Sequence, residues 1–417
     1  MSLILRLKKF FQNKQSKFLL IISILFSMFI IYLSQDLKSW TIFFGFLDIP
    51  VMWPSFADLR SHQSLVLTVE QNLNPYLENP NDPWKRVINY PFIWYYISNF
   101  LNWQSEIFFK GFLFFTISFY TFCFFKIFDQ YFKEKMILSY VVLLFFSTSS
   151  LLAIERGNTD MIIFIIVILL CYSKNYLLSF FLYLTASLLK IYPLLTIFLL
   201  IKITKFLMCA LATLGIIFFF NINYLDLYIS NTSSSNLSGI VYGVQGLING
   251  VPKLIERLNL TIFENINFLF LLYIIIIFLL IFSFFIGMNL KISRNKKELF
   301  IEEKLFLSGS AIYVGTYLTM SSFDYRLIFL FLTLPYLFTK KKNLLLLIFH
   351  FLFFISLNSI LFFSFANDPI DFVIIGILVH ICKFFILIYI TFISAEIIKN
   401  NINQFIFYVF KIFLLKK

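Results

Sequence analysis

The stretch Ile266–Met288 reads INFLFLLYIIIIFLLIFSFFIGM, and it decides the class of fold. No charged residue interrupts it, and its length matches the roughly 20 apolar residues that an α-helix needs to cross the hydrocarbon core of a bilayer. Backbone polar groups within that core must be satisfied inside the segment, which favours a helix over an open strand. The stretch therefore predicts a helical membrane protein.

Composition extends this prediction to the whole chain. Of its 417 residues, 60% are hydrophobic and 13% are charged, whereas about 25% of the residues in a soluble domain are charged. We expect an all-α, polytopic fold with about 12 spans in a single integral membrane domain over residues 1–417. The expected spans are Phe18–Ser34, Ile107–Ile127, Met136–Ala153, Asp160–Tyr172, Tyr176–Leu189, Ile191–Ile203, Phe206–Phe220, Ile266–Met288, Leu305–Met320, Leu327–Phe338, Leu344–Phe363 and Phe372–Ile393.

Basic residues indicate the orientation of these spans. Most of the 34 Lys and Arg residues fall in every second gap between them, and the cytoplasmic loops of membrane proteins carry such an excess. We therefore expect a cytoplasmic N-terminus, with the first span as an uncleaved anchor. This distribution of the +13 net charge argues against a nucleic-acid partner.

The other gaps lie on the extracytoplasmic face and include two long loops. Residues 35–106 are expected to hold short interfacial helices, with a short helix at Phe56–Gln71 and an aromatic interfacial segment at Phe92–Trp103. Residues 221–265 form the second loop. Long ordered loops in compact proteins are disproportionately functional. This face is therefore where the sequence predicts a site.

Asp58 is the first candidate on this face. It stands near the start of an expected helix, so its carboxylate is either a helix cap that accepts backbone N–H bonds or a general base at the membrane boundary. His62, further along the same helix, is expected to be a solvated loop histidine.

The segment from Glu155 to Asp160 also allows two interpretations. Gly157 can close one helix while Asn158 or Asp160 caps the next. Capping does not explain Glu155 and Arg156 at the edge of the hydrocarbon, where a charge is costly unless it is paired or hydrated.

Two further clusters carry charge on the same face. Lys190 either snorkels to the interface or binds an anion on a side that is poor in lysine. Asp324 and Arg326 flank Tyr325 in a short turn, as a structural ion pair or as a phosphate clamp.

Several chemistries lack their sequence signals. The four cysteines show no disulfide framework and no metal-ligand spacing. No P-loop, dinucleotide fingerprint or nucleophile elbow is present. Group transfer on the outer face would therefore draw on an activated substrate within the membrane, and a lipid-linked phosphate fits that requirement.

The order of the motifs resembles glycosyltransferase family 87. The resemblance is carried by Phe56-Ala57-Asp58-Leu59-Arg60, Asn74-Pro75-Tyr76, Asp82-Pro83-Trp84, Asn89-Tyr90-Pro91, Glu155-Arg156-Gly157-Asn158-x-Asp160 and Lys190-Ile191-Tyr192-Pro193. It implies a bacterial inner-membrane enzyme of the GT-C class that transfers a sugar, by default mannose, from a polyprenyl-phosphate carrier, with inversion at the anomeric carbon. The chain departs from the family at Lys85, where many members have Gly.

The resemblance also implies roles for individual residues. Asp58 inherits the role of the general base. The donor phosphate is expected to meet Arg156, Lys190 and Arg326, and sugar or acceptor hydroxyls to meet Asn89, Tyr90 and Asn158. The expected substrate-binding set is completed by Arg60, Arg86, Asp160 and Asp324. The implied partners are the polyprenyl-phosphate-linked sugar donor, a glycan or glycolipid acceptor and the lipid bilayer, with no metal and no cofactor.

Other functions stay open at this point. A transporter or flippase could line its pathway with the same ionisable residues, although no internal repeat is visible in the sequence. A polymerase or ligase for lipid-linked glycans would differ from a sugar transferase only in the size of its donor. A purely structural membrane protein would not need this clustering of polar residues.

Overall fold

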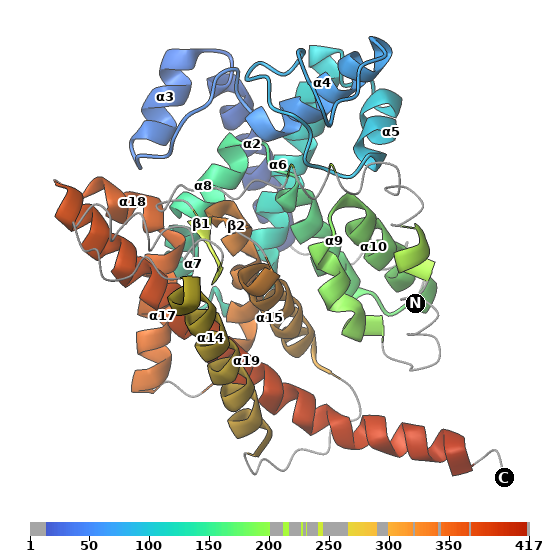
Figure 1. Cartoon of the computed structure of the whole chain (residues 1–417), viewed down its shortest axis with the longest axis vertical. Helices are drawn as coiled ribbons and strands as arrows, with labels where there is room; N and C mark the ends of the chain where they lie inside the picture. Colours follow the sequence, from blue (N-terminus) through green and yellow to red (C-terminus); the bar gives the residue numbers. More distant parts are fainter. Residues whose placement is uncertain are drawn as a thin grey trace. The chain divides into compact units, whose positions relative to one another are not determined.

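The structure is a computed structural model, and it describes residues 14–200, 212–216, 227, 231, 241–244, 266–289, 299–319, 322–340, 343–366 and 368–414. Helices dominate this part of the chain, beside two short strands (Figure 1). Contacts divide the chain into two compact units. The first comprises residues 1–169, 184–191 and 213–233, and the second comprises residues 170–183, 192–212 and 234–417.

The first unit contains most of the helices in the N-terminal part of the chain. Its elements are α2 (Lys14–Leu33), α3 (Leu37–Gly45), α4 (Ala57–Glu70), α5 (Ile93–Phe100), α6 (Glu106–Phe128), η1 (Asp129–Tyr131), α7 (Lys135–Phe145), α8 (Thr148–Glu155) and the greater part of α9 (Asp160–Tyr172). Helix α2 packs along α6. Its buried stripe includes Ser16, Ser23 and Ser27, and small residues of this kind let membrane helices approach closely.

The second unit is built around α15, α19 and a long 3₁₀ segment. Its elements are η2 (Tyr192–Leu200), β1 (Val241–Tyr242), α14 (Ile266–Asn289), α15 (Ile301–Thr319), β2 (Ser322–Phe323), η5 (Asp324–Thr333), α16 (Leu334–Phe338), α17 (Leu344–Leu357), α18 (Ser359–Ser364) and α19 (Pro369–Leu414). Strands β1 and β2 pair antiparallel, with Val241 opposite Phe323. Helix α10 (Tyr176–Leu189) contributes residues to both units.

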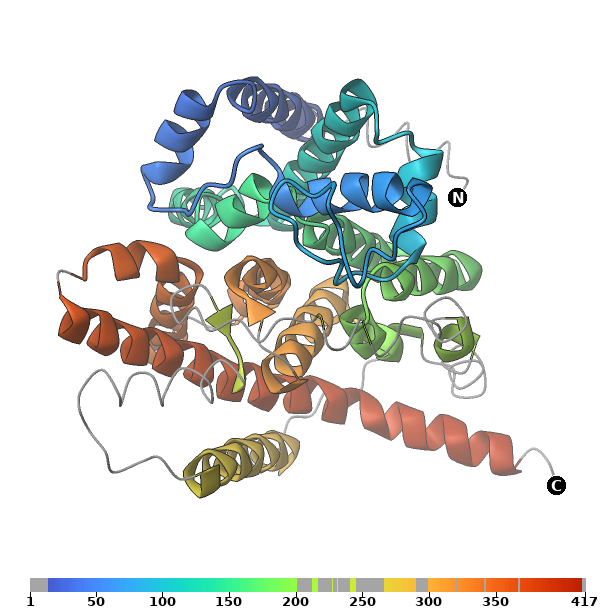
Figure 2. The same cartoon turned by 45° about the horizontal axis from the view of Figure 1, so that its top comes forward.

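Glycines set two close approaches in the second unit. A Cβ atom at Gly287 on α14 would lie 2.4 Å from the carbonyl oxygen of Phe392 on α19, and one at Gly309 on α15 would lie 2.5 Å from the carbonyl oxygen of Phe329 on η5. No real Cβ can occupy such positions without a shift of backbone. The side-by-side course of α14 and α19 (Figures 1 and 2) therefore depends on a residue without a side chain.

The all-α class is confirmed, and the chain has the apolar helices of a membrane protein. Within the described residues, three helical stretches are long and apolar enough to span a bilayer, namely Lys14–Leu33, Glu106–Tyr131 and Ile374–Lys399. The bent pair α7 and α8 makes a fourth if it counts as one span. The number of twelve spans and the single domain over residues 1–417 stay predictions.

Several expected spans are broken or use another helix type. The expected span Met136–Ala153 is split into α7 and α8, with a bend of 43° between the two helices. Ile191–Ile203 contains the 3₁₀ helix η2, and Leu327–Phe338 lies over η5 and α16. Pro335 stands near the start of α16. Proline has no N–H and is tolerated in the first turn of an α-helix, so Pro335 is compatible with the start of α16 at this position.

The two predicted loops and the last predicted span agree with the structure to different degrees. The helix expected at Phe56–Gln71 is present as α4, and the segment Phe92–Trp103 contains α5, while α3 was not expected. Of the second loop, residues 221–265, the structure describes 227, 231 and 241–244, and the rest of that loop lies outside the described residues, as does most of Phe206–Phe220. The last expected span ends at Ile393, but α19 continues to Leu414.

Replacing Gly309 by Ala should destabilise the protein by about 1–3 kcal/mol, because the new methyl group overpacks against the backbone of η5. Gly376→Ala on α19 is the matched control, since its Cβ would meet only the Phe363 ring at an ordinary 3.4 Å. Thermal unfolding in detergent should show a lower Tm for the first variant alone. Equal Tm values for the two variants would contradict the close approach of α15 and η5.

Candidate functional site

The start of α4 is fastened to the segment that follows α8. The Phe56 N–H donates to the Glu155 carbonyl at 3.2 Å, and the Asp58 N–H donates to the Arg156 carbonyl at 2.8 Å. Gly157 permits this approach, because its φ is +58° and a Cβ there would lie 2.9 Å from the Cβ of Phe56. Two distant parts of the sequence therefore meet at the first turn of α4.

The Asp58 carboxylate does not cap the helix. The N-cap of α4 is Phe56, which forms no side-chain capping bond. Asp58 Oδ2 instead accepts a hydrogen bond from Asn158 Nδ2 at 2.6 Å, and Oδ1 lies 3.5 Å from Arg86 Nη1. The side chain is 14% exposed. The capping interpretation is therefore wrong, and this carboxylate is held by side chains while part of it faces solvent.

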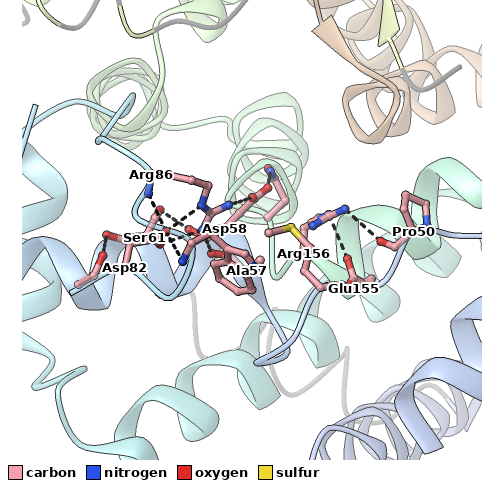
Figure 3. Close-up of polar contacts among 12 residues, drawn as sticks. Pro50, Ala57, Asp58, Ser61, Asp82, Arg86, Glu155 and Arg156 are labelled. Carbon is pink, nitrogen blue, oxygen red and sulfur yellow. Dashed lines mark hydrogen bonds and ion pairs between the residues drawn. The ribbon is translucent and has the colours of Figure 1, made fainter. Parts of the chain in front are cut away.

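Arg86 supports one side of Asp58 (Figure 3). Its guanidinium donates to both carboxylate oxygens of Asp82, at 3.0 and 3.1 Å, and to the Ala57 carbonyl at 2.6 Å. Burial alone would lower the pKa of Arg86, but the hydrogen bonds of Asp82 and the charges of Asp58 and Asp82 raise that pKa above its ordinary value. The guanidinium therefore remains a fixed positive charge beside Asp58.

Asn158 supports the other side of Asp58. Its Oδ1 accepts from the Asp160 N–H at 2.9 Å and from Lys190 Nζ at 3.3 Å. Lys190 also forms an ion pair with Asp160, and its ammonium lies 5.3 Å from the ring centroid of Tyr90. Asn158 thus does cap the start of α9, as one interpretation of the sequence had it, and it binds Asp58 at the same time.

Strained backbone brackets this cluster. Among the described residues, five that are not glycine have positive φ, and three of them are Asp or Asn, which tolerate the left-handed region. The other two are Phe56 and Lys85, with φ of 66° and 53°. Phe56 precedes Asp58 by two residues and Lys85 adjoins Arg86. Such strain persists where the surroundings over-determine the backbone, which is common at functional sites.

Arg60 and Arg156 each pair with a carboxylate of their own. Arg60 Nη2 lies 2.9 Å from Glu106 Oε1 on α6, so its side chain is directed to a structural ion pair. Arg156 Nε lies 3.1 Å from the buried Glu155, and Arg156 Nη2 donates to the Pro50 carbonyl at 3.0 Å (Figure 3). The charges of Glu155 and Arg156 thus compensate each other.

The two residues expected from the Asn89-Tyr90-Pro91 motif have different surroundings. Tyr90 is buried, and its carbonyl accepts from the Tyr76 hydroxyl at 2.8 Å while its ring packs near Lys190. Asn89 is half-buried, and its side chain makes no hydrogen bond within the described part of the chain. Its role as a substrate ligand stays a prediction.

Asp324 and Arg326 belong to the second unit and do not pair with each other there. Asp324 accepts from Lys383 Nζ at 2.7 and 2.9 Å and from the Ser359 hydroxyl, and all three side chains are buried. Arg326 Nη1 donates to the Ser322 hydroxyl at 3.0 Å. The expected pair of Asp324 with Arg326 is therefore wrong, because the partner of Asp324 comes from α19.

His62 is buried, which corrects the expectation of a solvated histidine. Its ring stacks on Trp94, with centroids 4.4 Å apart, and packs edge-on to Tyr90 at 4.3 Å. Neither ring nitrogen has a hydrogen-bond partner within the described residues. Burial, together with the charges of Lys190 and Arg86, holds the pKa of this imidazole well below its ordinary 6.5.

The sequence did not identify Asp82 as a site residue, although it stands in one of the quoted motifs. Its carboxylate is fully buried and accepts from the backbone N–H groups of Trp84 and Arg86, both at 3.0 Å. The opposite charges of Asp82 and Arg86, four residues apart, were the sequence signal that could have predicted this ion pair. Buried acidic side chains are rare unless they are paired.

Comparison with protein-family models, with curated proteins and with solved structures gives no significant match. Within the described residues, no group of three or more His, Cys, Asp or Glu side chains is arranged to hold a metal ion. The chemistry of the site therefore has to be argued from Asp58 and its neighbours.

The folded protein should become less stable as the pH is lowered, because His62 is buried in its neutral form. The unfolded chain takes up a proton below about pH 6.5, while the folded imidazole stays neutral, so folding loses up to about 1.4 kcal/mol per pH unit below that value. His62→Phe keeps a flat ring on Trp94 and cannot be protonated. Thermal unfolding between pH 7.5 and 5.5 should show a smaller decrease in Tm for this variant. Equal decreases would contradict the buried neutral state.

Proposed function

We propose that this protein is a membrane glycosyltransferase that uses a polyprenyl-phosphate sugar as donor, with mannose as the default sugar. The acceptor is a hydroxyl group of a glycan or glycolipid, and Asp58 is the general base. The proposal includes a bacterial inner membrane, a cytoplasmic N-terminus and an extracytoplasmic site.

One observation carries this proposal: a partly exposed carboxylate held in a fixed position by two side-chain donors. Asp58 contacts Asn158 and Arg86 while 14% of its side chain stays exposed. A general base must be oriented and must reach the proton that it removes. A carboxylate with a purely structural role needs neither exposure to solvent nor strained backbone at Phe56 and Lys85, in the two segments that hold it.

The reaction balances without a redox step. The acceptor oxygen attacks the anomeric carbon and forms the new glycosidic bond, while its proton moves to Asp58. The bond from the anomeric carbon to the phosphate oxygen breaks, and its electron pair leaves with the polyprenyl phosphate. Proton removal of this kind contributes roughly 10²–10⁴ to the rate.

Negative charge grows on the leaving phosphate and has to be stabilised by cations. Arg156 supports this role, since its Nη1 makes no hydrogen bond within the described residues and the group is 12% exposed. A guanidinium can bind phosphate with two parallel hydrogen bonds. The role of Arg326 as a phosphate ligand stays a prediction from the sequence.

A transporter is the second candidate function. Asp324 and Lys383 form a buried ion pair 2.7 Å long in an apolar unit, and ionisable pairs within membrane segments often mark transport pathways. The two functions differ in the fate of the glycosidic bond. A transporter moves the lipid-linked sugar intact, whereas a transferase releases it from the lipid.

Asp58→Asn should lower sugar transfer by roughly 10²–10⁴-fold, because an amide cannot take the acceptor proton. The assay uses purified protein in proteoliposomes, labelled polyprenyl-phosphate-mannose and a panel of glycan acceptors. Asp48→Asn is the matched control, since Asp48 is an exposed outer-loop residue whose left-handed φ of 54° suits Asn.

Transfer by the control and not by Asp58→Asn is the expected result. Equal transfer by both variants would remove Asp58 from the reaction. Intact donor with every acceptor, across a panel of lipid-phosphate sugars, would favour the transporter.

Chelation should leave transfer unchanged. In the proposed reaction arginine side chains stabilise the leaving phosphate, so treatment with EDTA should alter the initial rate by less than about twofold. Loss of activity on chelation that Mg²⁺ or Mn²⁺ restores would contradict this prediction.

A further inference from the structure

We infer that Asn158, Lys190 and Asp160 form a rigid support that orients the Asp58 carboxylate, and that Lys190 is a positioning residue and not a ligand of the donor phosphate. This inference rests on the proposed function. It replaces the phosphate-binding role that the sequence suggested for Lys190.

The contacts of Asn158 determine the orientation of its amide group. Its oxygen accepts two N–H donors, the backbone of Asp160 and the ammonium of Lys190. The amide nitrogen must then point the other way, where it donates to Asp58 Oδ2 at 2.6 Å. A flipped amide would place its nitrogen against two donors and its oxygen against a carboxylate. Lys190 thus fixes the direction of the hydrogen bond to Asp58.

Lys190 is already compensated and enclosed. Its side chain is 6% exposed and pairs with Asp160, whose side chain is fully buried. Its ammonium also lies over the Tyr90 ring, and the Trp94 indole N–H binds the carbonyl of Leu189 at 3.1 Å, next to Lys190 in the chain. A phosphate would have to displace Asp160 and leave that buried carboxylate without its ion-pair partner, which is strongly unfavourable.

The opposite side of Asp58 has the same construction. Arg86 pairs with Asp82, another fully buried carboxylate, and lies 3.5 Å from Asp58 Oδ1. The cluster contains the carboxylates of Asp58, Asp82 and Asp160 and two cations. The buried Asp82 balances the charge of Arg86, and the buried Asp160 balances that of Lys190. The remaining negative charge belongs to Asp58, whose side chain is the exposed one among the three aspartates. Proton uptake by Asp58 then leaves the cluster neutral.

The test compares removal of one partner with removal of both. Lys190→Met removes the ion-pair partner of the buried Asp160 carboxylate, whereas Lys190→Met with Asp160→Asn removes the pair as a unit. For a support, the single variant should lose roughly 10²-fold in kcat through misplacement of Asp58. The double variant should recover about tenfold or more of that loss. The KM for the lipid-linked donor should stay within about twofold in both.

A phosphate ligand predicts a different pattern. Donor KM would rise in the single and in the double variant alike, with no recovery of kcat, and that result would overturn the inference. The matched control is Lys126→Met with Asp129→Asn, which removes an ion pair 2.5 Å long near the end of α6. This control should leave kcat and donor KM unchanged.

Asn158→Asp provides a readout that a merely structural role would not give. The variant keeps the shape of the side chain but sets a second carboxylate against Asp58, so the acid limb of the kcat profile should move to higher pH. An unmoved acid limb, with kcat simply scaled down, would contradict the positioning role of Asn158.

A stability cycle separates this inference from the proposed function. Tm is measured for Asn158→Ala in the wild-type and Asp58→Ala backgrounds, and for Lys190→Met in the wild-type and Asp160→Asn backgrounds. Smaller losses in the second background of each pair would establish the support even if Asp58→Asn retained transfer and so removed Asp58 as the base. Additive losses in both pairs would overturn the support, whatever the enzyme assay gives.

Discussion

Two ion pairs, each with a buried carboxylate, define the surroundings of Asp58, and the geometry of the candidate site depends on them. Asp82 holds Arg86 on one side, and Asp160 holds Lys190 on the other. Burying such charges costs several kcal/mol per ion unless each is paired and hydrogen-bonded. The ammonium of Lys190 is enclosed with Asp160, and the guanidinium of Arg86, 32% exposed, is held by both carboxylate oxygens of Asp82, so Asp58 lies between donors that are themselves fixed.

The backbone supplies the second condition for this arrangement. Gly157 combines a positive φ with a close approach to Phe56, and two hydrogen bonds then join the start of α4 to the end of α8. Lys85 takes a left-handed φ immediately before Arg86. The contacts of Arg86 with Asp82 and Ala57 offset the strain of that conformation.

Pairing also changes how the positive charges on this face are interpreted. The sequence presented Arg60, Arg156 and Lys190 as available cations, but each has a carboxylate partner in the structure. Under the proposed function, a phosphate would have to compete with carboxylates already in place, and the exposed N–H groups of a guanidinium would compete better than a buried ammonium. Selectivity for a phosphate would then arise from geometry more than from net charge.

The sequence by itself determined the helical class, the apolar segments and the motifs that surround Asp58, because hydrophobic length and turn residues are local signals. It also placed α4 within the first loop. Only the tertiary structure decided the partners: Lys383 and not Arg326 for Asp324, and a buried aromatic pocket for His62. Pairing and burial depend on segments far apart in the chain, and no local pattern encodes which of them will meet.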